Sequence, residues 1–131
     1  MKLKQGAKER IKKAIKSNSF VVPENVRKAA AKGLELRKKF NRGGLSPSEA
    51  SEQGIRSGVN TANALVGGRI GLALLKDMRD YLTRHAGDAD AKGDESRGYW
   101  GKDSNPSAGW IAHHLWGAAA AKAWINSLNI E

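Results

Sequence analysis

Apolar residues recur at helical spacing through most of this 131-residue chain, and clusters of Gly, Pro and Ser divide the pattern into segments. Nowhere does a strand-length stretch alternate between apolar and polar residues. We therefore expect an all-α fold, a small bundle of about four to five helices. The spacing predicts these helices over residues 3–16, 23–40, 46–66, 70–86 and 106–128.

Local start and stop signals mark the expected helix ends. Pro23–Glu24 suits a first helical turn, Ser46–Glu49 reads as a capping box, and Asn105–Pro106 repeats the pattern of a cap followed by proline. Glycine pairs favour helix termination because they adopt the left-handed conformation without strain. We expect Gly43–Gly44 to end the second helix and Gly67–Gly68 to end the third.

Residues 87–105 are rich in Gly, Asp and Ser and show no period, which predicts a long irregular loop before the last helix. The first predicted helix carries a narrow apolar stripe among many lysines. We divide the chain into residues 1–20, a basic amphipathic N-terminal helix or arm, and residues 21–131, a compact helical domain.

Positive charge is concentrated at one end of the chain. Residues 1–42 carry 14 Lys and Arg against three Glu, a net charge of 14 − 3 = +11, and the remaining residues carry nine against ten, a net of −1. This excess is more than solubility requires and favours a polyanionic partner. Lys and Arg release condensed counterions from nucleic acid, which gives affinity without sequence choice.

We expect a nucleic-acid-binding protein without enzymatic activity, and we rank DNA above RNA. The alternative is a virion or head-assembly protein whose basic arm docks on an acidic protein partner. A solvated helix face with no partner is the third interpretation. The candidate phosphate contacts are cations of the first two predicted helices: Lys8, Arg10, Lys12, Lys13, Lys16, Arg27, Lys28, Lys32, Lys38 and Lys39. The candidate residues for stacking on bases are Trp100 and Trp110.

The sequence contains no recognisable catalytic or cofactor motif. It has no phosphate-binding Gly loop, no Ser elbow and no His-Glu-x-x-His. Two histidines four residues apart lie on the same face of a helix and can bind one metal ion together. Adjacent residues point about 100° apart, so His113 and His114 cannot do this. We expect no cofactor and no metal site. We also do not expect His85, Asp88 and His113 to converge in a cleft.

An acidic stretch lies in the predicted loop, and it comprises Asp88, Asp90, Asp94 and Glu95. These carboxylates could fold back on the basic helices. Such self-contact would compete with an external polyanion.

The chain is expected neither to span a membrane nor to carry a signal peptide. The longest run without a polar side chain, Leu115–Ala121, is far shorter than the roughly 20 residues that cross a bilayer. No apolar stretch of about 7–15 residues follows the basic N-terminus. The absence of Cys excludes disulfides and thiolate metal sites, and fits a reducing compartment or a virion interior at least as well as secretion.

Residues 106–117, which read PSAGWIAHHLWG, are followed by Trp124. With Arg84–His85 and the stretch VRKAAAKGL at 26–34, they resemble a small uncharacterised helical domain of tailed-bacteriophage proteins. The resemblance covers residues 23–126 and leaves the Lys-rich first helix outside. It implies a phage protein, found in the host cytoplasm or the virion, and no established activity.

Two departures from the family pattern affect the last helix. His113 stands where the pattern has Trp, and Ala118 stands where it has a second Gly after Gly117. Two alternatives are open for the last helix: a break near Gly117, or, because Ala favours a continuous helix, a straightening of the break between two short helices.

Overall fold

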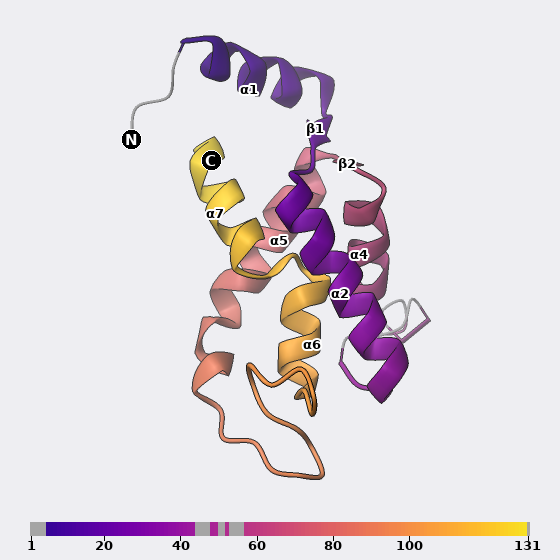
Figure 1. The fold of residues 1–131 in the computed structure, drawn as a ribbon. Helices are drawn as coiled ribbons and strands as arrows, with labels where there is room; N and C mark the ends of the chain where they lie inside the picture. The colour runs from indigo at the N-terminus through magenta and orange to yellow at the C-terminus, as the bar shows by residue number, and fades with distance from the viewer. Residues whose placement is uncertain (1–4, 44–47, 50–51, 53–56, 131) are drawn as a thin grey trace.

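The computed structural model describes residues 5–43, 48–49, 52 and 57–130, and within the first helix it describes the side chains of residue 9 and of residues 11 onward. The expected all-α fold is confirmed (Figure 1). The elements are α1 (Gln5–Ser17), β1 (Phe20–Val21), α2 (Glu24–Phe40), α4 (Gly58–Val66), β2 (Arg69–Ile70), α5 (Leu72–Arg84), the short 3₁₀ helix η1 (Ala86–Asp90), α6 (Ala108–Leu115) and α7 (Ala118–Leu128).

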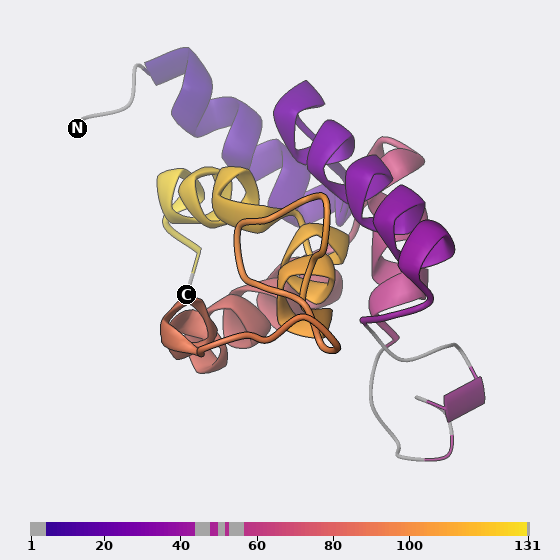
Figure 2. The same cartoon turned by 60° about the horizontal axis from the view of Figure 1, so that its bottom comes forward.

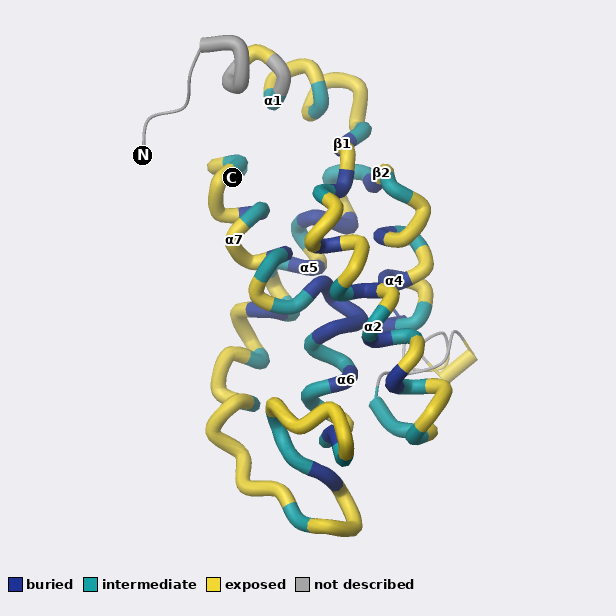
Figure 3. Tube along the Cα trace, viewed as in Figure 1, coloured by how far each residue is buried: buried dark blue, intermediate teal, exposed yellow. Residues whose placement is uncertain are grey.

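The centre of the fold is the packing of α2 against α6. The buried face of α2 carries small residues at helical spacing, and Gly33 lies where the two helices meet. A Cβ atom on Gly33 would lie 2.6 Å from the backbone nitrogen of Leu115. Glycine therefore sets how closely these helices approach. Ile111 and Leu115 of α6 are fully buried, and the C-terminal end of the helix is dark blue in Figure 3.

The last helical segment is broken near Gly117, which is one of the two alternatives for it, and the straightening is wrong. Gly117 adopts a φ of 95°, and Ala118 follows with a φ of 58°. A helix cannot pass through two successive left-handed residues. The backbone of Gly117 lies in a region that only glycine adopts without strain. Ala118, the next residue, adopts the ordinary left-handed conformation. The break gives six described α-helices where about four to five were expected, and it lets α7 pack against both α2 and α5.

The N-terminal part of the chain joins the body at a two-residue antiparallel ladder. Phe20 of β1 pairs with Ile70 of β2, and both side chains are buried. Just before β1, Asn18 adopts a left-handed φ of 56°, and its Oδ1 accepts a hydrogen bond from the backbone N–H of Leu72 at 2.6 Å. Asn18 thus caps the N-terminus of α5, where the preceding Gly71 has no side chain to do so. Beyond this junction α1 extends away from the other helices (Figure 1).

Two predicted helix ends fall at other residues, and the start of the helix expected over 46–66 lies partly outside the described residues, of which 48–49 and 52 are helical. Asn41, with a φ of 53°, caps α2 two residues before the expected Gly43. Helix α4 starts at Gly58, because the hydroxyl of Ser57 accepts from the N–H of Asn60 and the Ser57 backbone is extended. The capping box expected at Ser46 lies partly outside the described residues. Helix α6 is capped by the Ser107 hydroxyl rather than by Asn105, whereas Gly67 ends α4 as expected.

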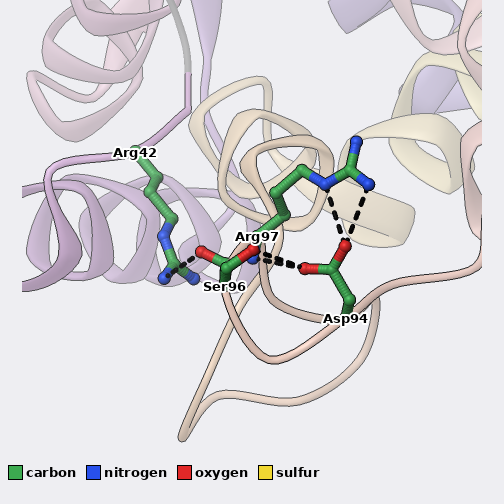
Figure 4. Close-up of polar contacts among 4 residues, drawn as sticks. All are labelled: Arg42, Asp94, Ser96 and Arg97. Carbon is green, nitrogen blue, oxygen red and sulfur yellow. Dashed lines mark hydrogen bonds and ion pairs between the residues drawn. The ribbon is translucent and has the colours of Figure 1, made fainter.

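The predicted long irregular loop is present between η1 and α6, and hydrogen bonds hold it in shape. Asp94 accepts from the backbone and side chain of Arg97, and the Ser96 carbonyl accepts from the Arg42 guanidinium at 3.1 Å (Figure 4). Arg42 also donates to the Asn105 side chain at 2.8 Å and to the Pro106 carbonyl at 2.9 Å. Figure 2 shows the loop from its own end of the molecule, near α6. Among the described residues no helix is both long and apolar enough to cross a bilayer.

Candidate nucleic-acid interface

The cations of α1 are turned to solvent. Lys12, Lys13 and Lys16 are exposed, and none of them forms an ion pair with a described residue. Ala14 on the other side of the helix packs against the core, so the lysines point away from the body. The side chains of Lys8 and Arg10, two further candidates, lie outside the described part of the structure.

The exposed side of α2 carries a second set of cations. Arg27, Lys38 and Lys39 are exposed and form no ion pair with any residue that the structure describes. The Lys39 ammonium lies 5.4 Å from the centre of the Phe40 ring, which favours a fixed position for this charge. Helix α2 has 17 residues and is therefore about 25 Å long, enough to face several phosphates of a duplex.

Two candidate contacts on α2 already have acidic partners. Lys28 lies 3.3 Å from Glu24 one turn earlier, but both side chains are more than 70% exposed, so this pair is weak and yields readily to a phosphate. Lys32 lies 2.7 Å from Asp103 in the long loop, and its side chain is only 40% exposed. The pKa of Asp103 is lowered, first by the hydrogen bond from Lys32 and then by that from Trp110.

Two other cations of the basic segment serve the fold. Arg37 donates from Nε to the Gly43 carbonyl at 3.0 Å, and Arg42 holds the long loop through its three hydrogen bonds. Their charge still adds to the local field, but Nε of Arg37 and both Nη atoms of Arg42 already donate to the protein.

None of the four carboxylates of the acidic stretch pairs with a described cation of α1 or α2. Asp88 pairs with His85 at 2.9 Å, Asp94 pairs with Arg97, and the Glu95 carboxylate accepts from the Tyr99 hydroxyl. The carboxylate that does reach a basic helix is Asp103, which lies outside that stretch in the sequence. Self-contact is therefore limited to one ion pair in the described residues.

The two candidate stacking residues contact each other. The rings of Trp100 and Trp110 meet edge to face with their centres 5.0 Å apart, and both side chains are half-buried. The indole N–H of Trp110 donates to Asp103 at 2.9 Å, and Lys32 lies 5.9 Å from the Trp110 ring. This joins the tryptophan pair to the basic side of α2.

The expectation that His85, Asp88 and His113 do not converge is wrong. All three line one cavity of about 210 Å³, together with Tyr81, Leu82, Ala86, Ala89, Trp100, Ala119 and Lys122. The 3₁₀ helix η1 turns the chain directly after α5, which brings Asp88 within 2.9 Å of His85 Nδ1. The break at Gly117 brings the first turn of α7 to the same place.

Burial changes the acid–base properties of the rings around this cavity. Desolvation lowers the pKa of His113 to about 4, helped by its neighbour His114, so the His113 ring is neutral at pH 7. Desolvation also lowers the pKa of His114, whose Nδ1 donates to the Trp110 carbonyl at 2.9 Å. Burial and then Asp88 raise the pKa of Tyr81 to about 12, so its hydroxyl keeps its proton.

Sequence reasoning missed the cavity because its lining comes from five elements, which are α5, η1, the long loop, α6 and α7. The spacing of His85 and Asp88 at the end of a predicted helix was a usable local signal for a hydrogen-bonded pair. Lys122, in contrast, carries no signal in the sequence that would connect it to these residues.

Within the described residues, no group of three or more His, Cys, Asp or Glu side chains is placed to hold a metal ion. No family model, curated protein or solved structure matches this chain.

Proposed function

We propose that this protein binds nucleic acid, duplex DNA foremost, through phosphate contacts made by α1 and the exposed side of α2. The observation that carries the proposal is the set of exposed cations without ion pairs among the described residues, three on α1 (Lys12, Lys13, Lys16) and three on α2 (Arg27, Lys38, Lys39). The basic segment has a net charge of +11, which is 14 cations minus three Glu. Solvent-exposed cations beside a nearly neutral body are free to neutralise phosphates. Nucleic acid then releases its condensed counterions, and this release favours binding.

A binding role is favoured over an enzymatic one by the lining of the cavity. Among the described residues around it, none is Ser, Thr or Cys, so the His85–Asp88 pair has no aliphatic hydroxyl or thiol beside it to activate, and the Tyr81 phenol keeps its proton because its pKa is raised to about 12. The resemblance to the phage domain supports a phage protein that works in the host cytoplasm or in the virion.

The test is a titration of a short DNA duplex at about 50 and about 200 mM salt. Affinity should fall steeply, because log K decreases with log salt by about 0.9 for each phosphate neutralised. Changing Lys12, Lys13 and Lys16 to Gln should reduce this slope by about 2 to 3, and changing Arg27, Lys38 and Lys39 to Gln should do the same.

The control is a variant with three exposed cations of the other segments, Arg84, Lys92 and Lys102, changed to Gln. It loses the same charge but should keep nearly the whole slope. Equal effects of all three variants would show that only net charge matters. Binding that does not depend on salt, or no binding at 50 mM, would overturn the proposal.

A second candidate function is docking on an acidic protein, and the apolar side of the arm favours it. Ile15 of α1 is 40% exposed and Val21 of β1 is 63% exposed, which gives a basic surface an apolar edge. In this case polyglutamate should compete with the partner, and Ile15→Ser should weaken binding as much as loss of a lysine does.

A further inference from the structure

The cavity at the end of α5 has a size and a lining that suit a single flat ring. Its volume of about 210 Å³ is below the roughly 300–1,000 Å³ typical of sites for larger ligands. Segments of α5, η1, the long loop, α6 and α7 surround it. A ligand held here would touch several elements at once.

Aromatic rings form much of the lining. The rings of Tyr81 and His85 are stacked at 4.3 Å with an angle of 24° between their planes. Behind them Trp116 stacks on Tyr81 at 4.5 Å and holds its position. The ring of His113 lies 4.9 Å from that of Trp100. His85 and Trp116 occupy the two faces of Tyr81, so the faces open to a ligand are those of His85 and of the Trp100–His113 pair. Such faces bind another π-system in preference to an aliphatic chain.

The polar groups of the cavity are available to a ligand. Within the described part of the chain, neither the His113 ring nor the Tyr81 hydroxyl forms a hydrogen bond, although both side chains are half-buried. A neutral imidazole offers one donor and one acceptor, and a protonated phenol offers a donor. Lys122 adds a positive charge at the exposed side of the cavity. The donors and acceptor of His113 and Tyr81 can pair with the polar edge of a nucleobase, and Lys122 can contact the phosphate beside it.

The cavity is also connected to the basic side of α2. Trp100 belongs to the cavity lining and contacts Trp110 at 5.0 Å, and Lys32 lies over the Trp110 ring at 5.9 Å. A single strand whose phosphates contact α2 therefore has aromatic surface along its path to the cavity.

We propose that this cavity binds one unstacked base of a single-stranded nucleic acid, an inference that rests on the proposed function. The base enters between the Tyr81–His85 pair and the Trp100–His113 pair. Its phosphates stay outside, where Lys122 and the cations of α2 contact them. The paired Asp88 carboxylate lies on the wall and disfavours entry of a phosphate itself.

The first experiment compares two strands of twelve nucleotides, oligothymidylate and an abasic strand with the same phosphates. The full chain should bind oligothymidylate about five- to a hundredfold more tightly, which corresponds to the stacking of one base. Equal affinity for the two strands would overturn the cavity proposal and leave the phosphate contacts of the proposed function intact.

The second experiment fills the cavity. Ala119 is an exposed lining residue on α7, and Ala123 is an exposed residue one turn later that does not line the cavity. Ala119→Phe should lower the affinity for oligothymidylate to that for the abasic strand, with unchanged affinity for duplex DNA. Ala123→Phe should leave all three affinities unchanged. Base preference that survives in Ala119→Phe would place the stacking elsewhere and overturn the proposal.

A third measurement separates the two proposals if no strand binds. Thymidine monophosphate, added alone, should shift the NMR signals of the Trp100 indole and the His113 ring in the unmodified protein and not in Ala119→Phe. This result with no strand binding would support the cavity and reject the phosphate surface. No shift would reject the cavity. The comparison of the two strands requires no substitution, so it stands even if Ala119→Phe lowers the melting temperature.

Discussion

The ammonium of Lys32 lies 2.7 Å from one carboxylate oxygen of Asp103, and the other oxygen accepts the indole N–H of Trp110 at 2.9 Å. One carboxylate thus holds a cation of the basic helix and a ring of the tryptophan pair at the same time. It also cancels a charge on the surface proposed to meet phosphate.

Asp103→Asn should strengthen binding to duplex DNA. The substitution removes one negative charge and releases Lys32, while the amide oxygen can still accept from Trp110. We expect affinity to rise about two- to fivefold near 100 mM salt and the salt slope to steepen by up to about one. Fluorescence anisotropy with a labelled duplex measures both. Asp90→Asn makes the same charge change at an exposed position away from the basic helices. An equal gain there would show that Lys32 is not involved.

Gly117→Ala should destabilise the fold. The backbone at Gly117 has a φ of 95°, and an added Cβ would lie 2.5 Å from the Cβ of Ala121. Backbone strain and the clash together should lower the free energy of unfolding by about 2–4 kcal/mol. Urea denaturation followed by circular dichroism measures this. A Cβ at Gly87 meets nothing within 4 Å, so Gly87→Ala should change stability by less than about 0.5 kcal/mol.

Stability should decline as the pH falls from about 6.5 to about 4. The pKa of His113 is lowered from 6.5 to about 4 by burial, so in this window the unfolded chain binds a proton that the folded chain does not. The stability is complete above pH 6.5 and is lost progressively toward pH 4. Because His113 is only half-buried, solvent screening reduces the effect to about 1–2 kcal/mol.

Thermal unfolding across this pH range tests the assignment to His113. His113→Phe keeps an aromatic ring and should flatten the pH dependence between pH 6.5 and 4. His114, whose pKa is also lowered, contributes in the same direction and leaves a smaller slope. The lowered pKa values of Asp94 and Asp103 act only below about pH 4. An unchanged slope in His113→Phe would contradict the prediction.

Asn18→Gly should weaken the start of α5. Glycine keeps the left-handed backbone at this position but loses the side-chain oxygen that accepts from Leu72. The loss of such a cap lowers the free energy of unfolding by about 1 kcal/mol. Asn41 also has a left-handed backbone and, among the described residues, no side-chain hydrogen bond, so Asn41→Gly should be neutral. Denaturation curves of both variants separate the cap from the backbone effect.

The positions of the helices could be predicted because local signals agree with the tertiary structure. The second predicted helix, 23–40, is α2 (Glu24–Phe40), where Pro23 precedes the first turn and Glu24 favours the positive end of the dipole. The spacing of Leu75, Met78, Leu82 and His85 predicts one buried stripe on the helix over 70–86; the first three are buried, and His85 is half-exposed at the helix end. Helix ends were harder to predict, because a single residue such as Asn41 can adopt the left-handed conformation before the expected glycines.

The site could be predicted only where one local segment forms it. The lysines of α1 lie together on one helix, and their exposure follows from their spacing. The partner of Lys32 lies 71 residues further on, since 103 − 32 = 71, and no periodicity connects them. The cavity likewise depends on the turn of η1 and the break at Gly117, which bring residues from distant segments together.

The cap that Asn18 provides has a consequence for how the two surfaces relate. Helix α5 begins at the residue held by Asn18, directly beneath the basic arm, and ends at Tyr81 and His85, which line the cavity. Its 13 residues form a rod about 20 Å long. A ligand bound to the basic arm and a ligand bound in the cavity would therefore contact opposite ends of the same rigid helix, α5.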